Sequence, residues 1–264
     1  MKILVTVKEV AEVADDFEIE GRSIPETYLE YDLNEWDDYA VEAAVRIAED
    51  REDEDVEVVA ATIGPERSEE TIRMALAKGV DRAVRVWDDA LAEADVLDPT
   101  TTARILAAVA EEEAPDLVLS GVQAADDGFG ATGVALADLL DMGWAAVVND
   151  LELTDGDASV RRELEGGVEE LTTVPCPAVL TIQTGINEPR YASLRGIRQA
   201  QRKELAVHTL ADIGLDPSLV DDDLTLAGMA KPESESDATL FEGSAEETAA
   251  ELATVLRDAG VGAE

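Results

Sequence analysis

Residues 116–140 read DLVLSGVQAADDGFGATGVALADLL, and this stretch predicts a strand, a glycine-bearing loop and a helix in direct succession. The apolar run at 116–120 is typical of a strand that is buried on both faces of a parallel sheet. The helix is expected over residues 131–140. In open parallel sheets, ligands bind beyond the carboxyl ends of the strands, at helix N-termini. The stretch therefore indicates an α/β fold and marks the candidate ligand site within it.

Strands and helices alternate on both sides of this stretch, through the first 140 residues. Helix N-caps are expected at Asn34, at Ser68 and at Asp98, which precedes a proline at the first helical position. A small hairpin is expected within residues 17–31. Such alternation predicts a parallel sheet that is covered by helices on both faces. The further buried strands are expected at residues 3–7, 56–63 and 83–86.

The pattern changes after residue 140. Three runs, at 149–153, 159–165 and 168–173, are expected to form antiparallel strands with glycine-bearing turns between them. The apolar run at 178–184 is expected to return to the main sheet. A basic segment, residues 190–203, is expected to be partly helical.

Two parts of the chain follow from these patterns. We expect an α/β domain over residues 1–205, in which a parallel sheet carries a small antiparallel addition. An extended acidic C-terminal arm is expected over residues 206–264. Its last helix, near residues 245–259, is amphipathic and is expected to dock on a partner.

The charge of the chain is extreme. It has 61 Asp and Glu against 20 Lys and Arg, a formal net charge of −41, whereas a small domain ordinarily carries about 2–8. Molar salt screens such repulsion, so the composition predicts a cytoplasmic protein of a salt-accumulating halophile, of haloarchaeal type; a merely acidic mesophilic protein is the alternative. The same charge argues against nucleic acid as a partner.

Other functions are limited by the residue types that are scarce. The single cysteine, Cys176, and the single histidine, His208, exclude an internal disulfide framework and leave almost no material for Cys- or His-based catalysis or a metal site. We read Cys176 as a packed thiol. No run of eighteen apolar residues predicts a membrane span, and no secretory signal is visible at the N-terminus.

The loop after residue 120 is the candidate nucleotide site. The main-chain amides of Ala131 and Thr132 begin a helix and can hold a phosphate, while Asp126 and Asp127 can accept from ribose hydroxyls or cap the helix. The pattern is neither a Walker A motif nor a GxGxxG motif, and no lysine is expected near a γ-phosphate. AMP, or the ADP half of a dinucleotide, therefore fits better than ATP hydrolysis. An ordinary strand-to-helix loop is the alternative.

The segment NEPRYASLRGIRQAQRK, residues 187–203, is the candidate docking surface. Five cations and no acids lie between Arg190 and Lys203, together with the apolar side chains of Tyr191 and Leu194. An apolar anchor within a cationic rim is typical of a protein interface. A solvated basic helix is the alternative.

The sequence resembles a known family, the electron transfer flavoprotein beta subunit. The resemblance rests on VRRELEGGVEEL, PCPAVLTI and NEPRYASLRGIRQAQRK, and on VTVKEV, AVEAAVRIAED and DLVLSGVQAADDGFGATG. It runs in unbroken order from Met1 to about Leu205, and the tail after His208 matches weakly. It implies an adenine-nucleotide-binding, Rossmann-like α/β domain that pairs with an alpha subunit, over which the C-terminal arm reaches.

The resemblance also implies cofactors and the residues that contact them. FAD lies mainly in the alpha subunit, and the beta subunit holds AMP, or a second FAD in bifurcating members. Gly130 and Ala131 stand where Asn and Gln are usual in the family, which removes side-chain contacts to the ligand. The nucleotide contacts fall on Thr6, Asn34, Ile63, Ala124, Asp127, Gly130, Ala131 and Thr132.

The remaining implications concern partners. The family's dehydrogenase-recognition loop falls on residues 190–200, where Arg195 and Gly196 replace the usual Pro and Asn. Glu169 corresponds to an acidic residue that positions the flavin domain. The family implies an electron carrier, not an enzyme, between flavin dehydrogenases and a membrane quinone oxidoreductase. The docking residues are expected to be Arg190, Tyr191, Leu194, Arg195, Ile197 and Arg198.

Two other functions are compatible with the same fold. A stand-alone adenine-nucleotide-binding sensor would use the same pocket without a redox role. An ATP-cleaving ligase would need the lysine and phosphate loop that the sequence lacks.

Overall fold

The computed structural model describes residues 1–51, 54–94, 96–154, 156–220, 224–232 and 238–261. The chain forms two compact units, Met1–Met229 and Ala230–Glu264. Each unit is described by itself.

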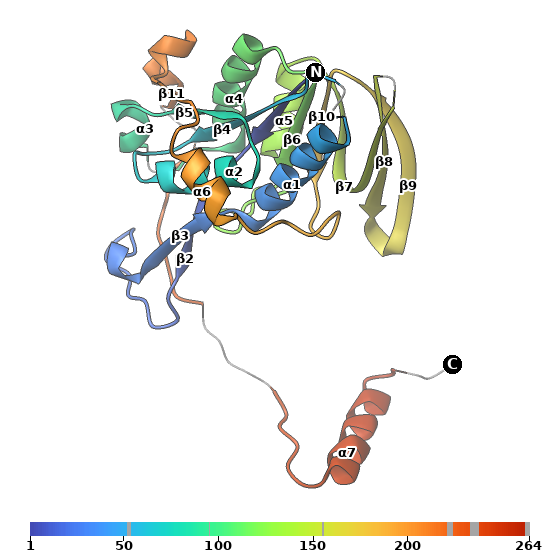
Figure 1. Ribbon diagram of the computed structural model, residues 1–264. Helices are drawn as coiled ribbons and strands as arrows, with labels where there is room; N and C mark the ends of the chain where they lie inside the picture. The colour runs from blue at the N-terminus through green and yellow to red at the C-terminus, as the bar shows by residue number, and fades with distance from the viewer. Residues whose placement is uncertain (52–53, 95, 155, 221–223, 233–237, 262–264) are drawn as a thin grey trace. The chain divides into compact units, whose positions relative to one another are not determined.

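The first unit contains a nine-stranded sheet in the order β11-β5-β4-β1-β6-β10-β7-β8-β9 (Figure 1). The neighbours from β11 to β7 are parallel, and β8 and β9 extend the sheet as an antiparallel meander. The predicted α/β fold is therefore confirmed, including its antiparallel addition. The strands are β1 (Lys2–Thr6), β4 (Glu57–Ile63), β5 (Arg82–Val86), β6 (Leu117–Gly121), β7 (Gly143–Thr154), β8 (Asp157–Leu164), β9 (Val168–Pro175), β10 (Ala178–Ile182) and β11 (Leu205–His208).

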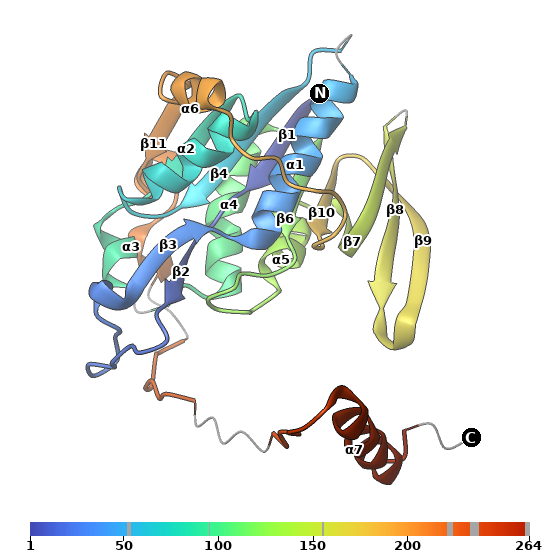
Figure 2. The ribbon, with the colours of Figure 1, turned by 60° about the horizontal axis from the view of Figure 1, so that its bottom comes forward.

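Helices cover both faces of this sheet (Figure 2). One core contains Ile3 and Val5 of β1, and Leu4 between them belongs to the other core, because successive side chains of a strand point to opposite faces. The first face packs on α1 (Glu35–Asp50), α2 (Ser68–Lys78) and α6 (Leu194–Ala200), and the second on α3 (Asp89–Glu93), α4 (Pro99–Glu113) and α5 (Thr132–Leu139).

The helix starts only partly follow the predicted caps. Asp98 accepts hydrogen bonds from the amides of Thr100 and Thr101, as expected. Asn34 occupies the cap position of α1, but its side chain makes no capping hydrogen bond. The prediction for Ser68 is wrong, because Arg67 occupies the cap position of α2 and the Ser68 hydroxyl donates to Glu9. Both side chains are engaged by distant parts of the chain.

The hairpin and one edge strand differ from expectation. The hairpin pairs β2 (Glu9–Val13) with β3 (Leu29–Leu33), so residues 17–31 supply mostly its connection. Residues 205–208 form β11, a short edge strand that pairs with β5, and the first unit consequently continues past Leu205 to Met229.

The second unit contains α7 (Ala245–Asp258), close to its predicted bounds. A capping box starts the helix, since Ser244 and Glu247 each accept from the other's backbone amide. Leu252, Val255 and Leu256 are exposed. No helix in the described part of the chain is long and apolar enough to span a bilayer.

Candidate functional site

A cavity of about 360 Å³ lies beyond the carboxyl ends of β1, β4 and β6. This volume falls within the range of small-molecule pockets, roughly 300–1,000 Å³. Segments far apart in the sequence meet here because the carboxyl ends of parallel strands share one edge of the sheet. All eight residues that the resemblance assigned to nucleotide contacts line the cavity: Thr6, Asn34, Ile63, Ala124, Asp127, Gly130, Ala131 and Thr132.

The loop between β6 and α5 forms one wall of the cavity. Gly128 and Gly130 have φ angles of +63° and +61°, a left-handed conformation that glycine adopts without strain. Ala131 occupies the N-cap position of α5 without a side-chain hydrogen bond to the helix. The first-turn amides of a helix have no partner within it, so this end of α5 offers free donors to an anion.

Asn34 fastens this loop to the start of α1. Its Nδ2 donates to the carbonyl of Gln123 at 2.9 Å, and its Oδ1 accepts from the amide of Ala125 at 3.2 Å. The side chain that was expected to cap a helix therefore holds the cavity wall.

Asp37, in the first turn of α1, is a functional candidate that the sequence analysis did not single out. It is 5% exposed, and its carboxylate accepts from the amides of Lys8 at 2.8 Å and Gly121 at 2.9 Å. A Cβ on Gly121 would lie 2.5 Å from Asp37 Oδ1, so only glycine permits this contact. Burial raises the pKa of Asp37 to about 7, against hydrogen bonds from Lys8, Asn34 and Gly121 that lower it.

Lys8 is the second residue that was missed. Its Nζ donates to Asp126 Oδ1 at 2.6 Å and to Asp127 Oδ2 at 2.7 Å. Burial lowers the pKa of Lys8, but these two hydrogen bonds outweigh burial and raise it above its ordinary value. The sequence analysis expected no lysine near a γ-phosphate; Lys8 lies beside the loop, and both of its side-chain hydrogen bonds go to these two carboxylates. The signal was its position two residues after β1, at the edge that the loop also reaches.

Asp127 is only partly free to bind a ligand. Besides Lys8, its carboxylate accepts from the amide of Phe129 at 3.0 Å. Asp126 likewise accepts from the amide of Asp127 at 2.8 Å. Both carboxylates therefore stabilise the loop.

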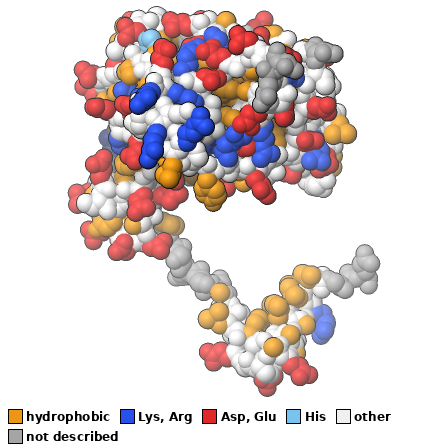
Figure 3. All heavy atoms as spheres, viewed as in Figure 1, with side chains coloured by type: hydrophobic (Ala, Val, Ile, Leu, Met, Phe, Trp, Pro, Cys, Tyr) orange, Lys and Arg blue, Asp and Glu red, His pale blue; other side chains and the backbone are white. Residues whose placement is uncertain are grey.

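The predicted docking segment lies on the surface next to α2. Tyr191 is 98% exposed and Leu194 is 78% exposed, so both apolar side chains face solvent. A hollow is lined by Leu194, Arg195, Arg198, Gln199 and Arg202. Figure 3 shows Lys and Arg side chains gathered over the region of α6.

Arg190 points inward, unlike its neighbour Tyr191. Its guanidinium pairs with Glu42 at 2.7 Å and with Glu49 at 2.6 Å on α1. The side chain of Glu42 is 4% exposed and also accepts from Arg46. Burial raises the pKa of Glu42, but hydrogen bonds from Arg190 and Arg46 outweigh it and leave the pKa below its ordinary value. Arg190 thus anchors the segment to α1.

Gly196 explains how α6 reaches its position. A Cβ at this residue would collide with the carbonyl oxygen of Ala77 on α2. The glycine therefore allows close packing of the two helices.

The structure puts Glu169 on β9, far along the sheet from the cavity. Its carboxylate is half-exposed and lies 3.9 Å from Arg161 Nε on β8. Cys176 is half-buried, and burial raises the pKa of its thiol. Among the described residues, no group of His, Cys, Asp and Glu could hold a metal ion.

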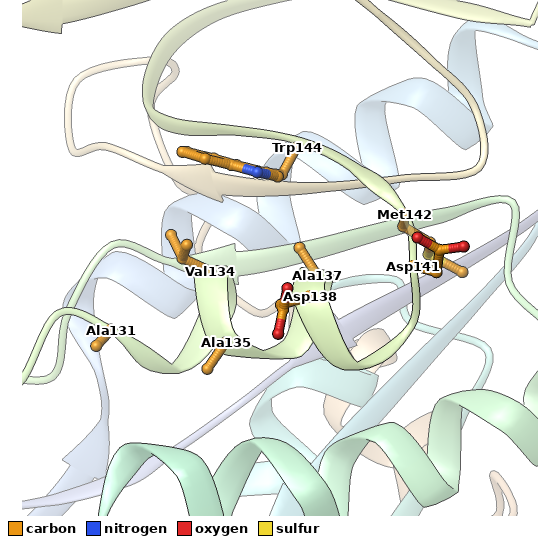
Figure 4. Close-up of a pocket in the computed structure, with 8 residues that line it drawn as sticks. All are labelled: Ala131, Val134, Ala135, Ala137, Asp138, Asp141, Met142 and Trp144. Atoms are coloured by element: carbon orange, nitrogen blue, oxygen red, sulfur yellow. The ribbon is translucent and has the colours of Figure 1, made fainter.

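A second, wider hollow of about 550 Å³ lies between α5 and the start of β7. Figure 4 shows Trp144 lying over the helix, with Val134 and Ala137 on the side that faces its ring. The polar side chains on its wall are the acids Asp138 and Asp141. Such a lining does not fit an anionic ligand, so the cavity at the strand ends is the better candidate site.

A parallel sheet with helices on both faces and a ligand-sized cavity at its carboxyl edge defines the class of open α/β ligand-binding proteins. The model of the electron transfer flavoprotein domain matches residues 23–213 of this chain. The chain is 47% identical to the electron transfer flavoprotein subunit beta of Methylophilus methylotrophus, over 98% of each chain. The chain belongs to the electron transfer flavoprotein beta subunit family.

Two other relatives show how far the similarity extends. The subunit beta of Bacillus subtilis is 33% identical over 97% of this chain and 98% of its own length. The human subunit beta is 38% identical over 82% of this chain and 84% of its own. These relatives are named as electron transfer flavoprotein subunits.

Proposed function

We propose that this chain is the beta subunit of a heterodimeric electron carrier, that it holds an adenylate in the cavity at the strand ends, and that it docks flavin dehydrogenases through Leu194. The observation that carries the proposal is the convergence of all eight expected nucleotide contacts on one cavity. The family implies a flavin and an alpha subunit.

The cavity fits an adenylate in three respects. The free amides at the start of α5 can bind a phosphate, and Gly130 and Ala131 leave its approach open. The main-chain groups of Ala124 and the side chain of Ile63 can contact the base. The volume of about 360 Å³ is within the range of small-molecule pockets, roughly 300–1,000 Å³.

In the assembled carrier, FAD supplies the electron transfer when it is bound, and the protein supplies its binding and orientation. This chain's part is to keep the adenylate site rigid and to bring a dehydrogenase close. Asn34 forms a hydrogen bond to the loop, and Asp37 accepts hydrogen bonds at the ends of β1 and β6. These bonds make the cavity wall rigid. Glu169 on β9 is proposed to position the flavin domain of the alpha subunit.

The docking proposal rests on exposure and charge. Leu194 and Tyr191 project from a segment whose base is fixed to α1 through Arg190. Arg195 and Arg198, beside Leu194, form the cationic rim, and Ile197 adds apolar surface. An exposed anchor on a fixed base loses little conformational entropy on binding.

The wider setting is proposed from composition and family. The carrier passes electrons toward a membrane quinone oxidoreductase, in the cytoplasm of a halophile of haloarchaeal type. The net charge of −41 supports the high-salt setting. The second unit is proposed to dock on the alpha subunit through Leu252, Val255 and Leu256 of α7, which lie exposed.

The test is to co-express the chain with its alpha subunit in concentrated KCl and to identify the extracted nucleotides by mass. One FAD and one AMP per heterodimer is the expected result. Two FAD and no AMP per heterodimer would instead support the bifurcating alternative. A chain that binds AMP but forms no heterodimer and carries no electrons would favour the stand-alone sensor.

Docking is tested separately with Leu194→Ala. We expect slower electron acceptance from a dehydrogenase with unchanged nucleotide content, because the side chain is exposed and does not line the cavity. Val207→Ala, an exposed apolar truncation on β11, is the matched control. Equal transfer rates for Leu194→Ala and the control would refute the docking role.

A further inference from the structure

The charges around the cavity present a difficulty for an anionic ligand. Of the described residues that line it, Asp37, Asp126 and Asp127 carry carboxylates, and only Lys8 carries a positive charge. Asp126 and Asp127 belong to the same loop that ends at the free amides of α5. A phosphate at those amides would therefore lie close to two carboxylates of its own sign.

Lys8 is placed to remove this repulsion. Its Nζ lies 2.6 Å from Asp126 Oδ1 and 2.7 Å from Asp127 Oδ2, so one ammonium bridges both carboxylates. The three side chains are each about one-third exposed, at 38%, 30% and 32%. Contacts shorter than the Debye length of about 3 Å at molar salt persist in concentrated KCl.

The backbone of Lys8 is also fixed. Its amide donates to the buried carboxylate of Asp37 at 2.8 Å, which positions the residue after the end of β1. The ammonium therefore starts from a rigid strand end and reaches across the cavity mouth to the loop.

We propose that Lys8 makes this cavity selective for nucleoside monophosphates over nucleosides, by neutralising Asp126 and Asp127 so that a phosphate can lie at the start of α5. The inference rests on the proposed adenylate site and specifies which residue admits the charged part of the ligand. Lys8 acts through the two carboxylates and is thus a positioning residue.

The test compares AMP with adenosine, which differ only in the phosphate. Binding is measured by titration calorimetry on the heterodimer in concentrated KCl after its nucleotide has been removed. For Lys8→Met we expect AMP to bind at least about tenfold more weakly, equivalent to 1.4 kcal/mol, while adenosine binding changes by less than about twofold. A merely structural role would weaken both ligands equally.

Two further variants make the test specific. Lys8→Arg keeps the charge and should retain most of the preference for AMP. Adding Asp126→Asn to Lys8→Met removes one of the two carboxylates that the lysine neutralises, without altering Asp127, and should recover part of the lost AMP binding. Circular dichroism verifies that each variant is folded.

The outcomes separate the two proposals. Equal losses for AMP and adenosine in Lys8→Met, no loss for either, or no recovery of AMP binding when Asp126→Asn is added to Lys8→Met would each overturn the role of Lys8 alone. Failure of the unaltered heterodimer to bind either ligand would refute the proposed adenylate site, and the role of Lys8 with it.

Discussion

Replacing Asp37 by Asn should change how the stability of the protein depends on pH. The carboxylate is 5% exposed, and burial raises its pKa from the ordinary 3.8 to about 7. A group whose pKa is raised in the folded state stabilises the protein fully below the unfolded pKa and loses that contribution as the pH rises through the folded pKa.

The magnitude follows from the two pKa values. At 1.36 kcal/mol per pH unit, a rise from 3.8 to about 7 corresponds to roughly 4 kcal/mol of unfolding free energy, lost between about pH 4 and pH 7. Asn does not ionise, but it offers one acceptor oxygen where the carboxylate accepts from two amides, so the variant loses one of these hydrogen bonds at every pH. The Asp37→Asn protein should therefore be less stable than the original near pH 4, and the difference should move by roughly 4 kcal/mol in favour of the variant as the pH rises through about 7.

Guanidinium unfolding of the purified chain in concentrated KCl, from pH 4 to pH 8, measures this difference. All other acids are common to both proteins, so their titration cancels in the comparison. Glu12→Gln, at an exposed acid on β2, is the matched control for the removal of one carboxylate. A difference between Asp37→Asn and the original protein that stays constant over this range would refute the assignment of a raised pKa.

Three more perturbations test other parts of the structure. Glu42→Gln should slow electron acceptance from a dehydrogenase several-fold with unchanged nucleotide content, because it weakens the anchor of Arg190; unchanged stopped-flow rates would contradict this. Gly196→Ala should destabilise the chain by roughly 1–3 kcal/mol, since its Cβ meets the Ala77 carbonyl; an unshifted unfolding midpoint would count against that packing. Truncation after Met229 should leave the first unit folded by circular dichroism but weaken pairing with the alpha subunit in sedimentation, and full pairing would exclude docking by α7.

The parallel sheet could be predicted because its strands are buried apolar runs. The runs at β1, β4 and β6 are bounded by turns and caps, and their positions depend mostly on local sequence. β11 was missed, since its four residues, LAVH, are too few to show a pattern and form a strand only by pairing with β5.

The ligand site was predictable only in part. The glycine loop and the start of α5 can be predicted from local sequence, because glycines and the start of a helical pattern are visible in a single segment. The roles of Lys8 and Asp37 arise where the ends of β1 and β6 meet α1, and no single segment reveals that meeting. Asn34 lies at the predicted N-cap position of α1, but it does not make the predicted capping hydrogen bond. Its side chain instead bonds a loop almost ninety residues away.

The same limit applies to the docking segment. Its charge and exposed Leu194 are visible in the sequence, whereas the inward turn of Arg190 depends on Glu42 and Glu49 of α1. A cation in a basic run can thus be structural when a distant buried acid binds it.

The most direct measurement is a crystal structure of the heterodimer purified from concentrated KCl without added nucleotide. The account predicts electron density for an adenylate in the cavity at the ends of β1, β4 and β6, with phosphate oxygens within hydrogen-bonding distance of the amides of Ala131 and Thr132. A cavity filled by water alone, in a heterodimer that carries its flavin, would contradict it.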